Sequence, residues 1–460
     1  MLNKKHFKNF EKIVGKENIF DDKAHMIAYS YDATRERYEP DAVLFPKDEA
    51  DLSEILKYCN ENQIIITPRG AGSGFTGGAL PKNGGIILAL EKHMNKILEI
   101  DEKNMLAIVQ PGVINMDLQN HVEALGLFYP PDPASEQYST LGGNVSENAG
   151  GMRAAKYGIT KDYVMALRAV LANGDIIQAG KKTIKDVAGY NIAGILIASE
   201  GTLAVITEIT LKLLPKPKYA SSYLAVFPSV EHAMNAVFKS LASGANPVAM
   251  EFIDALSVAA IKKKLGVELP EDAGALLIGD VDGNIREEVA FQIDTLQKSF
   301  EENGCSVFSV ADKKDEREKI WYARRNVSQC VTIYGSKKLN EDISVPRSKL
   351  PEALKEIYKI GEKYGFNVPC FGHAGDGNIH VNVMVDGSDP KQLEEGHKAI
   401  EEVFKLVVAM GGTLSGEHGI GLSKAPFMDI AFNDAELALF KSIKKAFDPK
   451  NILNPGKMGL

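Results

Sequence analysis

The segment PRGAGSGFTGGA, residues 68–79, constrains the fold of this chain more than any other stretch. It follows a β-branched run that is typical of a buried strand, so a strand leads the chain into a loop with few bulky side chains. Gly72, Gly74 and Gly77 satisfy the G-x-G-x-x-G spacing of dinucleotide-binding folds. In those folds a helix must start at the loop, because its N-terminus meets a pyrophosphate.

The residues after the loop exclude such a fold. Pro81, Gly84 and Gly85 stand where the helix would begin, and both residue types disfavour a helix interior. The loop still offers consecutive backbone N–H groups with little side-chain obstruction, which form a nest for an anion. A tight turn between strands is the alternative, but five glycines in the nine residues 70–78 exceed what a turn needs. We therefore expect a phosphate-binding loop.

Composition indicates an ordinary globular protein with two or three domains. The chain has 460 residues, of which 45% are hydrophobic and 25% charged, as expected for a protein with real cores. The net charge is −8, and the sequence contains no dense stripe of Lys and Arg. We therefore expect no nucleic-acid partner.

Neither a secretory signal nor a membrane span is predicted. Residues 1–15 carry mixed charges without a continuous apolar core, and no stretch approaches the roughly 18 apolar residues of a span. The four cysteines, Cys59, Cys305, Cys330 and Cys370, form no C-x-x-C pair, which favours neither a disulfide framework nor an iron–sulfur ligand set. We expect idle thiols in a reducing cytoplasm, with membrane association only through a partner subunit.

The order of elements predicts an α+β fold. Residues 1–40 form a helical lead-in whose first helix ends near Gly15. The apolar residues of that helix, spaced for one face, are Phe7, Phe10, Ile13 and Val14. Residues 42–67 have the pattern of strand, helix and strand, and short strands separated by Gly-rich turns continue to about Pro217.

Pro215 and Pro217 mark a boundary, because proline interrupts strands. Beyond it, alternating strand and helix patterns predict a second α+β domain over residues 218–410, with helices on one face of a sheet. Residues 411–460 form a separate C-terminal segment, in which a helix ends at Asp448 and an extended tail follows.

Two further segments are poor in bulky side chains. Residues 130–158 supply glycines and asparagines that suit close approach to a flat, polar heterocycle. Residues 185–213 place Ser199, Glu200 and Gly201 directly ahead of a strand.

Together, these three motifs resemble those of the FAD-dependent 2-hydroxyacid dehydrogenases of the vanillyl-alcohol-oxidase type, a family that includes glycolate oxidase flavin subunits and D-lactate dehydrogenases. The resemblance extends from about residue 40 to Lys457. It implies a two-subdomain FAD-binding domain over residues 1–217 and an α+β substrate (cap) domain over residues 218–410. The segment 411–460 would then return to the flavin and complete the active site.

The resemblance also assigns cofactor residues. The first loop would hold the FAD pyrophosphate, and the other segments would line the flavin and adenine. The assigned residues are Pro68, Arg69, Gly70, Ala71, Gly72, Ser73, Gly74, Thr76, Gly77, Gly78, Pro131, Asp132, Ser135, Gly142, Gly143, Asn148, Gly151, Tyr157, Glu200, Gly201, Ile206 and Asn454. Some relatives tether FAD through a His in the first loop. No His occurs between residues 68 and 79, so we expect non-covalent FAD.

The segment HAGDGNIH predicts a metal site independently of the family resemblance. If residues 375–378 form the turn, His373 and His380 are directly opposed across two strands, with Cβ atoms roughly 4.5–5.5 Å apart. Asn382 lies on the face of His380, because side chains alternate along a strand. A lone His is more often a satisfied core residue, but two of the nine histidines facing across one turn favour a shared ion.

The segment GGTLSGEHGIG, residues 411–421, suggests a third ligand. From the residues alone, Glu417 is equally well an exposed loop carboxylate or a ligand, with His418 pointing to the opposite side. The resemblance implies a two-His, one-Glu ion and makes His418 the catalytic base. Three protein ligands leave positions open for substrate. Zinc is the first expectation for this divalent metal, with iron and manganese as alternatives.

An arginine pair lies in a predicted helix at IWYARRNVSQ. Arg325 is assigned to a solvated face. Arg324 matches the substrate-carboxylate arginine of the family, and its fork suits a carboxylate, with Ser328 one helical turn further on. Relatives that oxidise 2-hydroxyglutarate have a lysine near the position of Asn340, and its absence favours a small substrate. The substrate-binding prediction is therefore Arg324, Ser328 and Asn382.

These expectations describe an FAD-dependent dehydrogenase of a small 2-hydroxy acid, glycolate or D-lactate. Since the cysteines do not support an iron–sulfur cluster, an iron–sulfur or other electron-transfer partner subunit, or a quinone-linked complex, is expected to take the electrons. Three alternatives stay open: a non-redox flavin transferase of the same fold, a dehydrogenase for a larger acid such as D-2-hydroxyglutarate, and a non-catalytic scaffold subunit.

Overall fold

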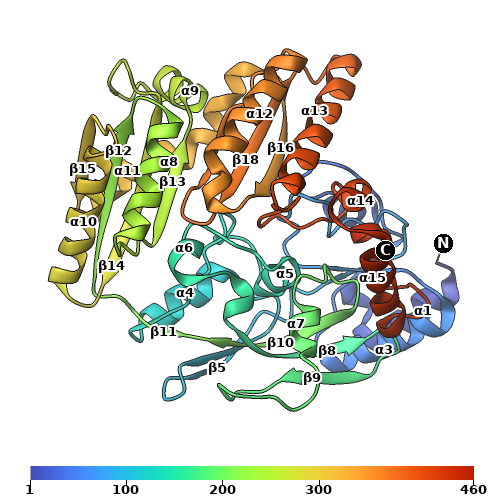
Figure 1. The fold of residues 1–460 in the computed structure, drawn as a ribbon. Helices are drawn as coiled ribbons and strands as arrows, with labels where there is room; N and C mark the ends of the chain where they lie inside the picture. Colours follow the sequence, from blue (N-terminus) through green and yellow to red (C-terminus); the bar gives the residue numbers. More distant parts are fainter. Residues whose placement is uncertain (1) are drawn as a thin grey trace. The chain divides into compact units, whose positions relative to one another are not determined.

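The structure, a computed structural model, describes residues 2–460 (Figure 1). The chain forms two compact units. The first comprises Met1–Gly151, Ile159–Lys216 and Glu417–Leu460, and the second Met152–Gly158 and Pro217–Gly416. The two expected boundaries, after residues 217 and 410, thus lie after residues 216 and 416. No composition signal indicated that residues 152–158 belong to the second unit.

The first unit contains two larger sheets of different kinds and one two-stranded sheet. Its four-stranded sheet has the order β1-β2-β4-β3, in which β2, β4 and β3 are parallel. Its five-stranded sheet, β5-β6-β10-β8-β9, is antiparallel, and β7 pairs with β11. The strands are β1 Ile19–Phe20, β2 Ala42–Leu44, β3 Ile66–Arg69, β4 Ile86–Ala89, β5 Ile97–Asp101, β6 Leu106–Val109, β7 Leu127–Phe128, β8 Val164–Leu171, β9 Ile176–Gly180, β10 Ala204–Lys212 and β11 Leu214–Pro215.

The first helix of this unit has the end and the apolar face that the sequence predicted. The first helix, α1, ends at Val14, and Gly15 follows with a φ of +86°, a conformation that favours glycine. Phe10 and Val14 are buried in one core with the inward residues of α3, among them Leu52. The helices are α1 Lys4–Val14, α2 Lys23–Tyr29, α3 Glu49–Asn62, α4 Asn115–Glu123, α5 Leu141–Glu147, α7 Ile192–Leu196, α14 Met428–Ala431 and α15 Asp434–Phe447.

The C-terminal tail joins the same sheet. Helix α15 ends before Asp448, as predicted. Leu453 then forms a parallel bridge with Ile66 of the edge strand β3. The N–H groups of Ile66 and Asn454 complete the pairing at 2.8 and 2.7 Å. The tail therefore ends beside the strand that leads into the glycine-rich loop.

The second unit is built on one antiparallel sheet of seven strands in the order β15-β12-β14-β13-β17-β18-β16. Its strands are β12 Tyr219–Phe227, β13 Ala249–Ile253, β14 Ala275–Gly283, β15 Val307–Ala311, β16 Lys337–Ser344, β17 Cys370–His373 and β18 Asn378–Val385. Its helices are α6 Ala154–Tyr157, α8 Val230–Ala242, α9 Ala255–Leu265, α10 Arg286–Glu301, α11 Lys314–Cys330, α12 Leu350–Tyr364 and α13 Pro390–Ala409.

The prediction of helices on one face of this sheet was wrong. Helices α10, α8, α12 and α13 form one layer (Figure 1), whereas α9 and α11 pack together on the other face. The reason is visible in the central strands β13 and β18, in which every residue is buried. A strand that is buried on both faces needs a cover on each. The expected α+β class is nonetheless confirmed.

No helix within residues 2–460 is both long and apolar enough to span a membrane. The four cysteines are unpaired, and three of them, Cys59, Cys330 and Cys370, are buried.

Candidate active site

The first glycine-rich loop leaves strand β3 at Arg69 and does not enter a helix, since the next regular element is β4. Gly72 and Gly77 adopt φ values of +66° and +82°, which favour glycine. A Cβ atom at Gly70 would overlap Oγ1 of Thr140, so the loop lies directly against the residue that caps α5. The prediction of a loop without a following helix is confirmed.

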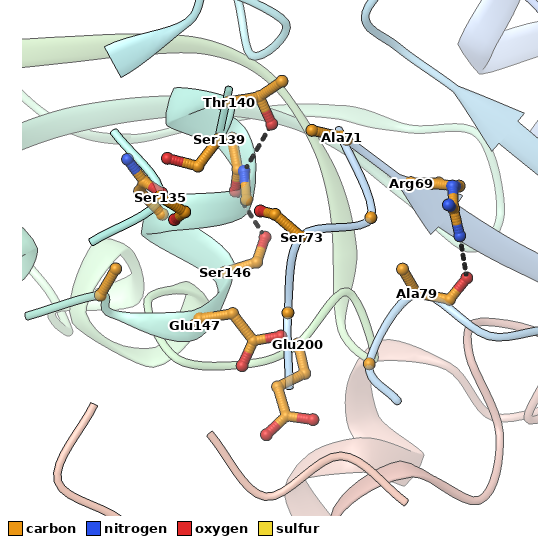
Figure 2. Close-up of a pocket in the computed structure, with 18 of the residues that line it drawn as sticks. Arg69, Ala71, Ser73, Ala79, Ser135, Ser139, Thr140, Ser146, Glu147 and Glu200 are labelled. Carbon is orange, nitrogen blue, oxygen red and sulfur yellow. Dashed lines mark hydrogen bonds between the residues drawn. The ribbon is translucent and has the colours of Figure 1, made fainter. Parts of the chain in front are cut away.

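Helix α5 presents the second predicted segment to this loop. The Oγ1 atom of Thr140 accepts a hydrogen bond from the N–H of Gly143 at 3.3 Å. Ser146 donates its hydroxyl to the carbonyl of Gly142 at 2.8 Å. Figure 2 shows Ser73 of the first loop next to Ser146. Both segments line one cavity.

That cavity lies in the first unit and brings most predicted cofactor residues together. Its wall includes Pro68, Arg69, Gly70, Ala71, Gly72, Ser73, Gly74, Gly78, Ser135, Gly142, Gly143, Glu200, Gly201 and Ile206. The predicted residues outside the wall are Thr76, Gly77, Pro131, Asp132, Asn148, Gly151, Tyr157 and Asn454. Wall residues that sequence reasoning missed include Pro111, Tyr138, Ser139 and Glu147.

Some predicted residues outside the wall hold its segments together. The amide of Asn454 donates to the carbonyls of Gly78 and Glu200, at 2.8 and 2.7 Å, so the tail ties the first segment to the third. The carbonyl of Thr76 accepts the N–H of Leu422 at 2.7 Å, which fixes the first loop to the C-terminal segment. These residues support the cavity without facing it.

Tyr157 has a different position from the other predicted cofactor residues. It belongs to the second unit, where its hydroxyl donates to both carboxylate oxygens of Asp282, at 3.0 and 2.8 Å. Lys156 forms an ion pair with the same carboxylate. These contacts attach residues 152–158 to strand β14.

Two buried carboxyl groups lie next to each other in the cavity wall (Figure 2). Glu200 accepts hydrogen bonds from the N–H groups of Ile420 and Gly421, at 2.7 and 2.8 Å. Glu147 has no partner for its Oε2 atom among residues 2–460. Burial, and then the charge of Glu200, raise the pKa of Glu147 well above its ordinary value.

The wall has the chemistry that a flat, polar cofactor requires. Besides Oε2 of Glu147, the buried atoms Oγ of Ser139 and Nδ2 of Asn144 lack a hydrogen-bond partner within the described residues. All three side chains line the cavity. Buried polar atoms are rarely left unpaired in folded proteins, and a ligand with carbonyl and ring-nitrogen groups would satisfy them. The glycines allow its close approach. The residues therefore fit FAD.

In the second unit, a row of polar side chains crosses the sheet. Glu251 of β13 is the cross-strand partner of His373 in β17, and Asp342 of β16 is the partner of His380 in β18. Directly opposed residues point to the same face of a sheet. This face is the one that α11 covers, since Arg324 of that helix contacts Glu251.

The histidine hairpin has a different register from the predicted one. Residues 374–377 form the turn, and His373 pairs with Asn378, while His380 is opposite Phe371. The prediction of directly opposed histidines was wrong, because Asn378 starts the strand instead of closing the turn. Its side chain bonds to Asp342 of β16, which holds it in the sheet. The two imidazole rings are diagonal neighbours, with centroids 5.3 Å apart.

Glu251 is one of two residues of this row that sequence reasoning missed, Asp342 being the other. Glu251 is fully buried. Its Oε1 atom lies 2.6 Å from Nδ1 of His373, and its Oε2 accepts from Nε and Nη2 of Arg324 at 2.8 and 2.7 Å. Burial alone would raise the pKa of Glu251, but the charges of His373 and Arg324 outweigh it and lower that pKa. The sequence signal was a single acidic residue inside the apolar strand AMEFI.

Arg324 keeps one edge of its guanidinium group for another anion. Nε and Nη2 both donate to Glu251, whereas Nη1 has no hydrogen-bond partner in the part of the chain that the structure describes. The guanidinium carbon lies 5.2 Å from the centre of the Phe371 ring. The N–H groups at the end of the fork, one each from Nη1 and Nη2, suit a carboxylate.

The other predicted substrate residues have partners within the protein. Asn382 is fully buried, accepts from the amide of Asn340 at 2.8 Å and donates to the carbonyl of Pro369 at 2.9 Å. Ser328 accepts from Nζ of Lys338 at 2.6 Å. Burial lowers the pKa of Lys338. The sequence analysis aligned the lysine of 2-hydroxyglutarate-oxidising relatives with Asn340 only. It missed Lys338, which lies two residues earlier on the same face of β16.

The third predicted metal ligand follows the last residue of the second unit. Asp342 accepts the N–H of Gly416 at 2.9 Å, and Glu417 comes next in the chain. His373, His380 and Glu417 are the three predicted ligands, and the two histidines are neighbours within the second unit. Two imidazoles and a carboxylate are a donor set that suits zinc, iron or manganese.

His418 lines the cavity of the first unit together with Glu417. Its ring centroid lies 5.2 Å from that of Phe75, and its carbonyl accepts the hydroxyl of Thr76 at 3.2 Å. The imidazole predicted as the base is thus a wall residue of the cavity that fits FAD.

Comparison with known proteins agrees with this geometry. A family described as "FAD binding domain" matches residues 40–180, and one described as "FAD linked oxidases, C-terminal domain" matches residues 216–458. The chain is 41% identical over 448 residues to glycolate oxidase subunit GlcD of Bacillus subtilis (strain 168), covering 97% of this chain and 95% of that protein. It is 36% identical to D-lactate dehydrogenase of Anaerostipes hadrus, covering 91% and 89% of the two chains.

Solved structures agree on the fold alone. The structure of p-cresol methylhydroxylase with substrate bound superposes with a TM-score of 0.80 at 18% identity, covering 100% of this chain and 98% of that one. The 4-ethylphenol oxidase from Gulosibacter chungangensis superposes with a TM-score of 0.77 at 19% identity, covering 99% of this chain and 98% of that one.

Proposed function

The chain belongs to the family of FAD-linked oxidases, and we propose that it oxidises glycolate or D-lactate, a small 2-hydroxy acid, to the 2-oxo acid. The relatives named glycolate oxidase subunit and D-lactate dehydrogenase support this substrate class. The observation that carries it in the structure is Arg324, whose half-buried guanidinium is oriented by Glu251 and keeps two N–H groups at its end for a carboxylate.

FAD would lie in the glycine-lined cavity, with its diphosphate on the loop of residues 70–78. When bound, FAD supplies the acceptor for the hydride from C2 of the substrate. We propose that it is held without a covalent bond, since the loop contains no His. Acid precipitation should then release all flavin into the supernatant, and flavin that stays with the precipitated chain would contradict this.

His373, His380 and Glu417 would hold a divalent metal, with zinc as the first candidate and iron or manganese as alternatives. A bound ion would act as a Lewis acid toward the substrate hydroxyl. Three protein ligands are the number found in catalytic sites that keep a position open for substrate.

The protein side of the reaction divides into binding and proton transfer. Arg324 binds the substrate carboxylate and thereby fixes the orientation of C2. His418 accepts the proton of the 2-hydroxyl group as the general base. With its carboxylate held by Arg324 and its hydroxyl proton transferred to His418, the substrate would be set to lose its C2 hydride to bound FAD and to leave as the 2-oxo acid.

A separate electron-transfer protein would reoxidise the flavin. The B. subtilis relative is named as a subunit, and the scattered cysteines of this chain do not support a cluster of its own. We propose an iron–sulfur or other electron-transfer partner subunit as the acceptor.

Anaerobic spectra test the proposed reaction. FAD-loaded protein is mixed in turn with glycolate, D-lactate, L-lactate and D-2-hydroxyglutarate, and bleaching of the flavin absorbance is recorded. We expect rapid bleaching with glycolate or D-lactate. A flavin that none of these acids reduces would favour a non-redox transferase or a scaffold subunit instead.

One observation favours a second candidate, a larger 2-hydroxy acid with a second anionic group. Lys338 lies against Ser328, one helical turn from Arg324, and would pair with that group. Replacement of Lys338 by Met should then raise KM for D-2-hydroxyglutarate and leave KM for glycolate unchanged. Equal effects on both acids would remove this candidate.

A further inference from the structure

We infer that Glu251 is a shared positioning residue, which holds the imidazole of His373 for the metal and the guanidinium of Arg324 for the substrate carboxylate. This inference rests on the proposed function, because that function gives His373 and Arg324 their roles. It adds a residue that contacts neither metal nor substrate and acts through both of their binding groups.

The first argument is the division of the carboxylate between two partners. Each oxygen of Glu251 serves one of them: Oε1 serves His373 at 2.6 Å, and Oε2 serves Arg324 at 2.7 and 2.8 Å. The side chain of Glu251 has no exposed surface, so water does not compete for it. A fully buried carboxylate needs compensation by charge and hydrogen bonds, and here the two functional side chains provide it.

The second argument concerns which nitrogen of His373 faces the metal. A neutral imidazole carries one proton, and a carboxylate at Nδ1 draws the proton to that atom. The lone pair is then on Nε2, and a metal would bind there. Histidine ligands usually make such a bond through their other ring nitrogen, and loss of the partner typically weakens metal binding 10- to 100-fold.

The third argument concerns the direction of the Arg324 fork. Glu251 takes the side edge, formed by Nε and Nη2, and leaves the end formed by Nη1 and Nη2. Since β13 lies within the sheet and α11 packs on it, the edge that Glu251 occupies fixes the direction of the end. Without this bond, the long arginine side chain has other rotamers available.

A second ion pair in the same layer provides the matched control. Asp280 of β14 accepts Nη2 of Arg317, also on α11, at 3.0 Å, and it bonds to Trp321 and Ser222. It joins the same helix to the same sheet, but it has no contact with a predicted metal or substrate residue. Replacement of Asp280 by Asn reports the purely structural part of losing such a carboxylate.

The experiment compares Glu251→Gln with Asp280→Asn in FAD-loaded protein. Zinc affinity is measured by competition with a chromophoric chelator, and KM and kcat are measured by steady-state oxidation of the preferred hydroxy acid. We expect Glu251→Gln to bind zinc 10- to 100-fold more weakly, by the principle above, and to raise KM about tenfold or more. Asp280→Asn should lower the melting temperature yet leave zinc affinity and KM within about twofold of wild type. Both variants should keep FAD.

Single replacements of the two partners separate the outcomes. Arg324→Lys should raise KM without changing zinc affinity, and His373→Ala should abolish zinc binding. If Glu251→Gln moves only one of the two readouts, or neither, the shared role is wrong. If His373→Ala keeps its zinc, the proposed metal site itself is wrong, and that result is independent of Glu251.

A second variant covers the case in which Glu251→Gln does not fold. Glu251→Asp keeps the negative charge but shortens the side chain by one methylene, so that it no longer reaches both partners. We expect zinc affinity to fall at least fivefold or KM to rise at least fivefold. Wild-type values of both would overturn the inference.

Discussion

The carboxylate of Asp342 accepts a hydrogen bond from the backbone N–H of Gly416 at 2.9 Å, and so strand β16 holds the residue that directly precedes Glu417. Asp342 is fully buried and also accepts the hydroxyl of Ser415 at 3.0 Å. The same carboxylate bonds to Asn378, at the start of the strand that carries His380. One side chain therefore links the loop before Glu417 to the histidine hairpin.

The replacement Asp342→Ala should loosen this loop. The N–H of Gly416, the hydroxyl of Ser415 and the buried amide of Asn378 each lose an acceptor, and losing a hydrogen bond to a charged group costs about 1.5–3 kcal/mol. We expect a lower melting temperature and, because the backbone before Glu417 is no longer fixed, about tenfold weaker zinc binding. Thermal unfolding and chelator competition measure the two effects. Unchanged zinc affinity in a destabilised variant would limit Asp342 to a structural role.

Removal of any predicted metal ligand should abolish metal binding and spare FAD. His373→Ala, His380→Ala and Glu417→Ala each leave two ligands, too few to keep a divalent ion against a chelator. FAD should stay in the two histidine variants, since the wall of its cavity includes neither histidine. Glu417 does line that wall, but its replacement leaves the glycine-rich loop and helix α5 intact, so Glu417→Ala should keep FAD as well. Metal analysis and flavin absorbance are read on the same samples. A fully active wild-type protein without any metal would contradict the assignment.

The sequence predicts best those features that depend on neighbouring residues. The helix that buries Phe10 and ends before Gly15 follows from local spacing and from the positive φ that glycine tolerates. The exclusion of a dinucleotide helix after the loop follows from Pro81 and its neighbouring glycines in the same way.

Features that depend on distant pairing were not predictable. Glu251 joins His373, 122 positions away, and Arg324, 73 positions away, and no spacing rule relates such residues. The hairpin register was missed because Asn378 is held by a bond to β16, which turn chemistry does not include. Helices cover both faces of the second sheet because its central strands are buried on both faces. A short apolar run in the sequence does not by itself show whether a strand is buried on one face or on both.

The replacement Gly70→Ala should weaken FAD binding. The added methyl group would overlap Oγ1 of Thr140, so the phosphate loop must move away from α5. Overpacking of this kind costs roughly 1–3 kcal/mol, which corresponds to about a 5- to 150-fold loss of affinity. Flavin fluorescence during titration of the apoprotein measures it. In the double variant with Thr140→Ala the overlap disappears, and affinity should partly return; no recovery would contradict the steric explanation.

Asp254 should give the second unit a pH-dependent stability. It is fully buried, and burial raises its pKa from 3.8 to about 6, although the N–H of Cys370 and other donors oppose this. The folded pKa thus exceeds the unfolded one, so the contribution is complete below about pH 3.9 and is lost as pH rises through about 6. Its size is on the order of 2–3 kcal/mol.

The variant Asp254→Asn isolates that contribution. Its side chain does not titrate, so the melting temperature of wild type minus that of the variant should fall between pH 4 and 6 and stay level above about pH 7. Thermal unfolding of both proteins in matched buffers measures the difference. A difference that does not depend on pH, or one that grows across this range, would show that Asp254 is not the titrating group.

Replacement of His418 should separate proton transfer from metal binding. His418→Ala should keep FAD and metal, because the three ligand atoms come from His373, His380 and Glu417. It should also bind substrate, since Arg324 is intact. The variant should lose the rate of flavin reduction by roughly 10²–10⁴-fold, the usual contribution of a positioned general base. This loss should shrink as pH rises, because hydroxide then removes the hydroxyl proton instead.

Stopped-flow bleaching of the flavin across a pH series, with metal assayed in each sample, measures the effect. Glu417→Ala serves as the comparison, and we expect it to lose its metal as well as its rate of flavin reduction. If His418→Ala bleaches at the wild-type rate, or loses its metal together with its activity, His418 is not the base.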